Sequence, residues 1–311
     1  MNIAILFPGQ GSQYPGMADP WLDHPAGKDV IERASEVLGW DVAEVSRDPE
    51  ALKRTEFVQP AVFVCDLAAF AVLAEEGVET DMAAGHSLGE YAALIASGAV
   101  EMEAGLGALA ARAEAMGHAS RENPGAMTAL VGISRDEAQE ICDVAGRGDV
   151  LAVANENAEK QTVLSGSETA IARAEELARG RGAKAIRLPV AGAFHSPLME
   201  PALGPVRELL ARVEFREPAF AIAPNVSAIP TTQATALRDS LSRHLVSPVR
   251  WDATMKAMEE SGVTWFVEAG PGDVLSRLAR RAVPGATVRT VGSPDEARSV
   301  AEDIRRELDD F

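Results

Sequence analysis

A serine placed at a sharp turn is the residue of this sequence best suited to nucleophilic chemistry. Residues 85–91 read GHSLGEY, which contains the pattern G-x-S-x-G centred on Ser87. In such a nucleophile elbow a buried strand ends, the chain turns, and a helix begins, so that the serine is exposed at the bend. Residues 81–84 can end a strand, and residues 88–96 have the apolar spacing of a helix. The pattern therefore predicts a nucleophilic hydroxyl at position 87.

The same five residues also fit a glycine-rich turn with an idle serine, so the surrounding sequence decides between the two interpretations. Residues 8–13 read PGQGSQ and follow a predicted buried strand at residues 2–7. A glycine-rich loop after a first strand can hold phosphate, but this loop lacks the third glycine and the later acid of a dinucleotide site. The other interpretation is that the loop supplies an oxyanion donor opposite Ser87.

Two further side chains favour chemistry at Ser87. Arg112 lies within residues 105–116, a predicted helix otherwise rich in Ala, Leu and Met. An arginine on such a helix either extends to water or meets a buried anion. His195 follows a predicted strand at residues 185–190, and a serine needs such a base to become a nucleophile. The alternatives are a surface arginine and a histidine that packs in the core.

Taken together, these motifs resemble the malonyl-CoA:acyl carrier protein transacylases, which are the stand-alone relatives of the acyltransferase domains of fatty acid and polyketide synthases. The resemblance covers essentially the whole chain. It rests on five features in family order: FPGQGSQ at residues 7–13, GHSLGEY at residues 85–91, Arg112, AFHSPLM at residues 193–199, and EAGPG at residues 268–272.

The resemblance implies a ping-pong transfer of a malonyl group from malonyl-CoA to the phosphopantetheine thiol of an acyl carrier protein. Ser87 would carry the acyl group, and His195 would act as the general base and acid. The expected pathway is fatty acid synthesis. The alternatives are a discrete acyltransferase that serves a polyketide synthase in trans and a serine thioesterase, in which water would replace the carrier thiol.

The resemblance also assigns the groups that support catalysis. The backbone N–H groups of Gln10 and Leu88 are the expected oxyanion donors. A backbone carbonyl at His244 is expected to orient His195. Most relatives have Gln at this position, but a carbonyl does not depend on the side chain. A second histidine so near the site could shift the pKa of His195.

Arg112 decides the expected substrate class, because a planar guanidinium can hold both oxygens of the malonyl carboxylate. Phe194 matches relatives that select malonyl over methylmalonyl units, and His86 belongs to the expected substrate pocket. By the resemblance, residues 153–166 are expected to form a loop that lines the cleft and contains Asn155 and Gln161. Asn155 could support the site or simply form a turn. No metal and no cofactor are expected.

The order of predicted elements indicates an α/β fold with two parts. Strands alternate with helices almost throughout, which is typical of a largely parallel sheet. Between residues 123 and 191 the predicted order is β-α-β-β-α-β, the ferredoxin-like pattern. We therefore expect a hydrolase-like large domain, residues 1–122 and 192–311, with a ferredoxin-like subdomain, 123–191, inserted in it.

Composition and charge limit which partners and which cellular compartment are expected for this chain. The 311 residues carry a net charge of −18, which argues against nucleic-acid binding. No signal peptide is recognised, and the apolar run at residues 61–74 is interrupted by Asp66 and is judged too short to cross a bilayer. The two cysteines, Cys65 and Cys142, are expected to be packed thiols. A cytoplasmic monomer without membrane contact is expected.

An acidic carrier protein would have to dock on a local basic patch against this overall charge. Arg277, Arg280 and Arg281 form the densest basic run. They share a helix face by their spacing. The run could equally be a solvated face. The other candidate surface lies on the small subdomain and comprises Arg173, Arg179 and Arg181.

Overall fold

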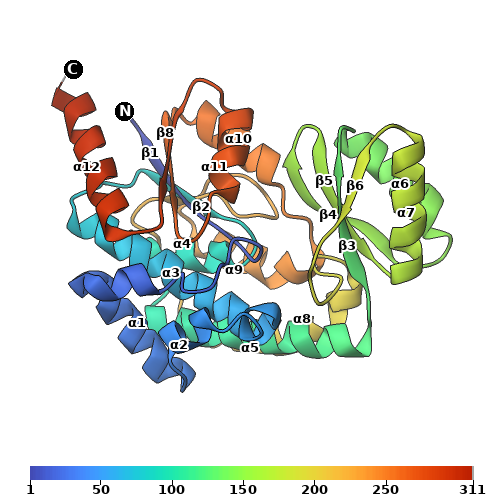
Figure 1. Ribbon diagram of the computed structural model, residues 1–311, viewed down its shortest axis with the longest axis horizontal. Coiled ribbons are helices and arrows are strands. Elements are labelled where there is room, and N and C mark those ends of the chain that lie inside the picture. The colour runs from blue at the N-terminus through green and yellow to red at the C-terminus, as the bar shows by residue number, and fades with distance from the viewer. Residues whose placement is uncertain (310–311) are drawn as a thin grey trace.

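Five parallel strands form the sheet of the larger unit. The computed structural model describes residues 1–309, and within them the strand order of this sheet is β7-β2-β1-β8-β9 (Figure 1). Strand β1 (Ile3–Phe7) lies between β2 (Met82–Gly85) and β8 (Trp265–Ala269), and all five residues of β1 are buried. A parallel strand covered on both faces needs such a continuous apolar run.

Helices cover both faces of this sheet, as alternate residues of β1 show. Ile5 packs into one hydrophobic core together with the apolar helix α3, and Leu6 packs into a second core together with α10 and α11. The helices and remaining strands of this unit are α1 (Pro25–Leu38), α2 (Val42–Arg47), α3 (Thr55–Glu75), α4 (Gly89–Ala96), α5 (Met102–Glu122), α8 (Glu200–Leu210), β7 (Ala221–Ile222), α9 (Ala234–Arg243), α10 (Trp251–Glu260), α11 (Val274–Ala282), β9 (Thr287–Val291) and α12 (Pro294–Asp309).

The smaller unit is an antiparallel sheet with two helices on one face. Its strand order is β4-β5-β3-β6, with α6 and α7 packed together on the outer side. This is the strand order of a ferredoxin-like fold, and the predicted α/β fold with a separate small sheet is confirmed. The elements are β3 (Ala126–Val131), α6 (Arg135–Gly146), β4 (Leu151–Ala158), β5 (Gln161–Gly166), α7 (Glu168–Gly180) and β6 (Lys184–Arg187). The proposed boundaries at 123 and 191 stay a prediction.

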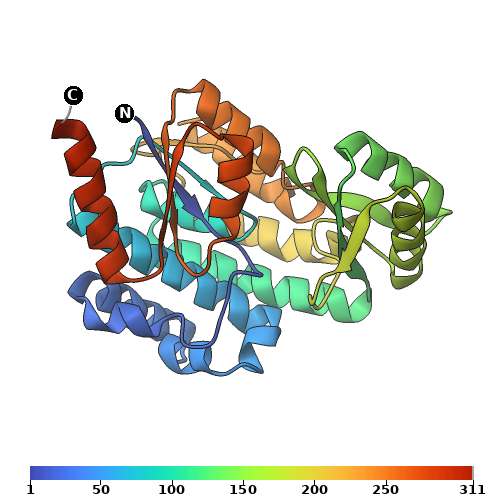
Figure 2. The same ribbon diagram turned by 45° about the horizontal axis from the view of Figure 1, so that its top comes forward.

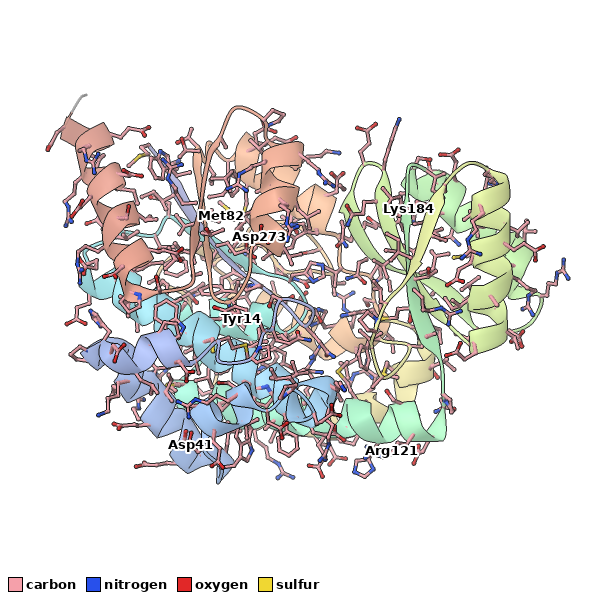
Figure 3. The ribbon with its side chains drawn as sticks, in the orientation of Figure 1. Tyr14, Asp41, Met82, Arg121, Lys184 and Asp273 are labelled. Atoms are coloured by element: carbon pink, nitrogen blue, oxygen red, sulfur yellow. The ribbon has the colours of Figure 1, made fainter. Side chains whose placement is uncertain are left out.

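The two units lie side by side and are joined along β4 (Figures 1 and 2). Figure 3 places Lys184 in the smaller unit and Asp273 in the larger one. The N–H of Val249 donates to Ala154 O, and the N–H of Glu156 donates to Val249 O, both at 2.8 Å.

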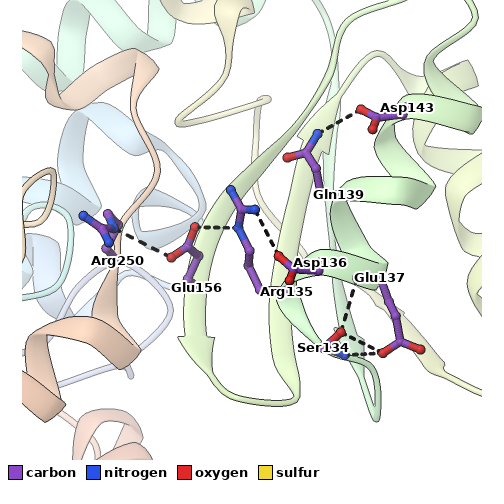
Figure 4. Close-up of polar contacts among 8 residues, drawn as sticks. All are labelled: Ser134, Arg135, Asp136, Glu137, Gln139, Asp143, Glu156 and Arg250. Carbon is purple, nitrogen blue, oxygen red and sulfur yellow. Dashed lines mark hydrogen bonds and ion pairs between the residues drawn. The ribbon is translucent and has the colours of Figure 1, made fainter.

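A shared carboxylate adds to this junction. The Glu156 side chain lies between two arginines (Figure 4), 3.2 Å from Arg135 on α6 and 3.9 Å from Arg250 in the larger unit. The segment just before α10 is therefore tied to the small sheet by backbone and side-chain contacts.

Helix α3 corrects one expectation. By length and composition it is apolar enough to cross a membrane, whereas the sequence argument judged its apolar run too short. Of its most apolar window, 78% is buried within the protein. Its apolar residues are therefore used for packing, and the buried Cys65 is one of them.

Candidate active site

Ser87 lies at a strained turn between β2 and α4. Its φ angle is +54°, a conformation that L-residues rarely adopt. Two glycines make the turn possible, because a Cβ at Gly85 would lie 1.9 Å from the carbonyl oxygen of Gly89, and one at Gly89 would lie 2.2 Å from that of Phe7. The strand–turn–helix geometry of the G-x-S-x-G pattern is therefore present.

His195 lies within hydrogen-bond distance of the serine. Its Nε2 is 2.8 Å from Ser87 Oγ, and its Nδ1 is 3.0 Å from the carbonyl oxygen of His244 and 3.2 Å from that of Ser247. Carbonyl oxygens only accept, so Nδ1 carries the proton and Nε2 is left to accept from the Ser87 hydroxyl. A serine whose proton can pass to a neighbouring base is set up for nucleophilic attack.

The guanidinium of Arg112 lies beside this pair without a carboxylate partner among residues 1–309. Only 1% of the residue is exposed. Its Nη2 donates to Ser87 Oγ at 3.0 Å, and its Nη1 donates to Gln59 Oε1. Its Nε has no partner in the described part of the chain. A buried cation without an anion is costly, so the site favours a ligand that brings a negative charge.

The two predicted oxyanion donors face the same pocket. Gln10 and Leu88 line it together with Ser87. Across residues 1–309 neither of their backbone N–H groups donates to a protein acceptor, whereas the N–H of Ser87 is used by Asn225. The loop packs tightly on the elbow, since a Cβ at Gly9 would lie 2.5 Å from His86 O. Both free N–H groups suit an oxyanion.

The remaining predicted pocket residues also line this cavity. Phe194, His86 and Asn155 all contribute to its wall. The Asn155 amide lies 3.3 Å from His86 Nε2, but the closer partner is Asn157 Oδ1 at 2.9 Å. The sequence argument gave no role to Asn157.

The stretch that was expected to be a loop, residues 153–166, mostly forms the hairpin of β4 and β5. Gln161 does not line the active-site cavity. Its side chain instead accepts from Arg281 at 3.1 Å, on the surface near α11. The expectation that Gln161 lines the same cleft as Asn155 is therefore wrong, because Gln161 lies at the turn of the hairpin, opposite Ala158, whereas Asn155 lies further along β4, opposite Val163.

Sequence reasoning also missed two residues that contact this group. Gln59 accepts from Arg112, and its only signal was a buried polar position in the apolar helix α3. Asn225 accepts from the Ser87 N–H at 2.7 Å. It follows β7 beside a proline, where asparagine usually indicates only a turn.

Burial sets the protonation states in this pocket. Burial and then the charge of Arg112 lower the pKa of His195 to about 3, so the imidazole is neutral and ready to accept a proton. The charge of His86 acts in the same direction, while the His244 carbonyl opposes it. Burial raises the pKa of Glu90 to about 7, although Arg112 opposes this, so Glu90 does not fully balance the guanidinium.

Comparisons with known proteins identify the family of this chain. The family model described as "Acyl transferase domain" matches residues 5–309. The malonyl CoA-acyl carrier protein transacylase of Bacillus subtilis is 35% identical over 313 residues, covering 99% of each chain. The chain belongs to this family of acyltransferases. The Escherichia coli enzyme of the same name is 34% identical, covering 97% of this chain and 99% of its own.

Solved structures of the family share the whole fold. The malonyl CoA-acyl carrier protein transacylase from Coxiella burnetii superposes with a TM-score of 0.94 at 34% identity, covering 97% of both chains. A malonyl-transacylase solved in complex with a type II PKS acyl-carrier protein has a TM-score of 0.94 at 32% identity, covering 97% of this chain and all of its own. The superpositions therefore include both the larger and the smaller unit of this acyltransferase.

Proposed function

We propose that this acyltransferase moves a malonyl group from malonyl-CoA to the phosphopantetheine thiol of an acyl carrier protein through a malonyl-Ser87 ester. The observation that carries the proposal is the buried guanidinium of Arg112, 3.0 Å from the nucleophile and without a carboxylate partner in residues 1–309. A malonyl group supplies the missing carboxylate, and pairing it with Arg112 places the thioester carbonyl over Ser87.

In the first half-reaction Ser87 Oγ attacks the thioester carbon while His195 Nε2 takes its proton. The negative charge on the carbonyl oxygen is met by the N–H groups of Gln10 and Leu88. The carbon–sulfur bond then breaks, and His195 returns the proton to the departing CoA thiolate. In the second half-reaction His195 takes the proton of the carrier thiol, which attacks the ester, and then returns a proton to Ser87. These steps need only groups of the protein and the two substrates.

The side of the pocket at Phe194 favours an unbranched malonyl unit. Phe194 is 6% exposed and lines the cavity together with His195, where a methyl group on C2 of the acyl chain would compete for space. One such contact is worth about 1–3 kcal/mol, so the preference is graded. Malonyl is the unit that fatty acid synthesis consumes, and we place the chain there. The relative in complex with a polyketide carrier supports polyketide synthesis as the second candidate.

The test is isolation of the covalent malonyl-enzyme. It must form from malonyl-CoA without carrier protein, and it must release malonyl to a fatty acid or polyketide carrier when either holo carrier is added. Release to water at the same rate would instead support a thioesterase.

The pH dependence of acylation follows from the surroundings of His195. Its pKa of about 3 means that the base is already neutral across the physiological range. We expect kcat/KM for malonyl-enzyme formation, which reports the free enzyme, to be flat from about pH 5 to 8. The charge of Arg112 is one cause of the lowered His195 pKa. Once a malonyl carboxylate neutralises that charge, the pKa of His195 rises. The acid limb of the single-turnover rate at saturation should therefore lie at higher pH than that of kcat/KM.

Rapid-quench measurements of acylation at several malonyl-CoA concentrations and pH values show whether the acid limb of the rate at saturation lies at higher pH than that of kcat/KM. An acid limb of kcat/KM near pH 6.5, the ordinary histidine value, would contradict it.

The basic run predicted for carrier docking lies on the exposed face of α11. Arg277 pairs with Asp273 on the same helix, while Arg280 and Arg281 form no ion pair with residues 1–309. Arg281 also borders a surface hollow between α11 and the β4–β5 turn, together with Lys160. Of the two candidate surfaces this one is favoured, because Arg173 and its neighbours on the small unit are paired with acids.

We expect Arg280→Glu or Arg281→Glu to raise the apparent KM for carrier protein roughly tenfold and to weaken its salt dependence, because each reverses a charge that faces an acidic partner. Formation of the malonyl-enzyme should be nearly unchanged. Arg306→Glu on α12 is the matched control, since it makes the same change in net charge. The two half-reactions are assayed separately. Equal losses in both would assign these arginines to CoA binding or to the fold.

A further inference from the structure

Asn225 makes five hydrogen bonds from a fully buried position at the base of the active site. It lies just after β7 with 0% of its surface exposed. Its backbone N–H donates to Glu90 Oε2 at 2.9 Å, and its carbonyl accepts from the N–H of Arg250 at 3.0 Å. Both bonds hold the residue in place and leave its side-chain amide to act on its neighbours.

Two backbone groups determine the orientation of that amide. The N–H of Ser87 can only donate, so the atom 2.7 Å from it is the amide oxygen, Oδ1. The carbonyl of Gly85 can only accept, so the atom 2.6 Å from it is the amide nitrogen, Nδ2. One side chain therefore binds both the end of β2 and the nucleophile itself.

The same oxygen also determines the state of His244. Its Nε2 lies 3.1 Å from Asn225 Oδ1, and an acceptor there requires Nε2 to carry the proton. His244 Nδ1 is buried and has no partner in the described residues, so this is the one hydrogen bond that orients the ring there, beside its packing against the His195 ring with the centroids 5.0 Å apart. The carbonyl of His244 in turn accepts from His195 Nδ1 at 3.0 Å. An unbroken path of contacts thus runs from Ser87 through Asn225 to His195.

We infer that Asn225 is the positioning residue that aligns Ser87 with His195, with the ring of His244 as its connection to the base. Ser87 comes from the elbow, whereas His195 comes from the segment after the small sheet, so their alignment needs a link between distant parts of the chain. Asn225 does not itself line the pocket, and it forms no hydrogen bond with the Arg112 guanidinium. It should therefore affect bond making and not substrate affinity. The inference rests on the acyl-serine mechanism proposed above.

The test measures acylation and binding separately. We expect Asn225→Ala to slow single-turnover malonyl-enzyme formation roughly ten- to a hundredfold, the effect of losing one or two hydrogen bonds at the reacting groups. The Kd of malonyl-CoA, measured by calorimetry in a Ser87→Ala background, should change by less than about threefold. Ser240→Ala, a buried serine on α9, is the matched control and should leave both unchanged. Unchanged acylation, or an equal loss of binding, would overturn the inference.

The single variants of His244 test the connection between Asn225 and His195 even if Asn225→Ala does not fold. His244→Ala keeps the backbone carbonyl and removes the ring, and we expect acylation to slow several-fold. His244→Gln should recover most of that rate, because its amide N–H can reach Asn225 Oδ1. If Asn225→Ala folds, the double variant His244→Ala/Asn225→Ala should acylate more slowly than either single variant by less than the product of their two losses. Both substitutions remove the same hydrogen bond between His244 and Asn225, so its loss is counted only once. Multiplying losses, or no recovery with Gln, would show that the two residues act independently.

A fluorophosphonate probe separates this inference from the proposed function. Such a probe reacts with a serine activated by histidine and needs no malonyl carboxylate. If the wild-type protein reacts with the probe and forms no malonyl-enzyme, the proposed function fails, and the effect of Asn225→Ala on the labelling rate still tests the alignment. If the wild type forms malonyl-enzyme, and Asn225→Ala reacts with malonyl-CoA and with the probe at the wild-type rates, the inference fails and the proposed function stands.

Discussion

Ser87→Ala should abolish the covalent malonyl-enzyme. After mixing with malonyl-CoA, the wild-type protein should gain the mass of one malonyl group, and the variant should gain none. Removing a serine nucleophile from a serine–histidine site costs on the order of 10⁶-fold in rate, so transfer to carrier protein should fall below detection. Intact-mass spectrometry followed by peptide mapping checks both the number and the position of the label.

Ser97→Ala is the matched control for this experiment. Ser97 is a buried serine at the opposite end of α4, where its hydroxyl donates to the carbonyl of Leu94. It should become labelled at Ser87 like the wild type. A malonyl group found on any residue other than Ser87, or label that persists in Ser87→Ala, would refute the acyl-serine assignment.

Arg112→Ala should weaken the preference for malonyl over acetyl. The substitution removes the partner of the malonyl carboxylate, while an acetyl group never had one. A charge-assisted pair is worth about 1.5–3 kcal/mol, so the ratio of malonyl to acetyl transfer should fall roughly ten- to a hundredfold. Acetyl transfer should fall less or rise, because the guanidinium is no longer left buried without an anion. Competition between malonyl-CoA and acetyl-CoA, read by intact mass, measures the ratio directly.

Two further arginine variants control for loss of structure. Arg121→Ala on the same helix removes an exposed arginine paired with Glu56 and should leave the ratio unchanged. Arg112→Lys keeps the charge but loses the planar fork, and an intermediate ratio is expected. Equal losses of malonyl and acetyl transfer in Arg112→Ala would mean that the residue supports the fold instead of the substrate.

Much of the architecture could be predicted from local patterns. The buried strands at β1 and β2 are continuous apolar runs, and the small unit has its six elements in the predicted order. The elbow could be predicted from its local pattern, although only the need for Gly85 is set by contacts within the elbow, whereas Gly89 is needed because it lies against Phe7 of β1. Arg112 and His195 were found because a charged or titratable side chain in an apolar setting needs an explanation.

The network around Asn225 could not be predicted in this way. Its contact with Ser87 joins residues far apart in the chain and depends on the pairing of β7 with β2, which is only two residues long. The contact of Gln161 with Arg281 likewise depends on how the two units meet. Neither arrangement leaves a periodic or compositional signal, because each is set by tertiary packing.

The left-handed backbone at Ser87 and His195 has a consequence for stability. Their φ angles are +54° and +56°, and each such residue costs about 1–2 kcal/mol that a glycine would avoid. The chain is thus less stable than its own backbone would permit, at the two places where a hydroxyl and an imidazole must meet. A glycine at either position would relieve this backbone strain but would remove the side chain that the reaction needs. Activity and stability therefore oppose one another at these two residues.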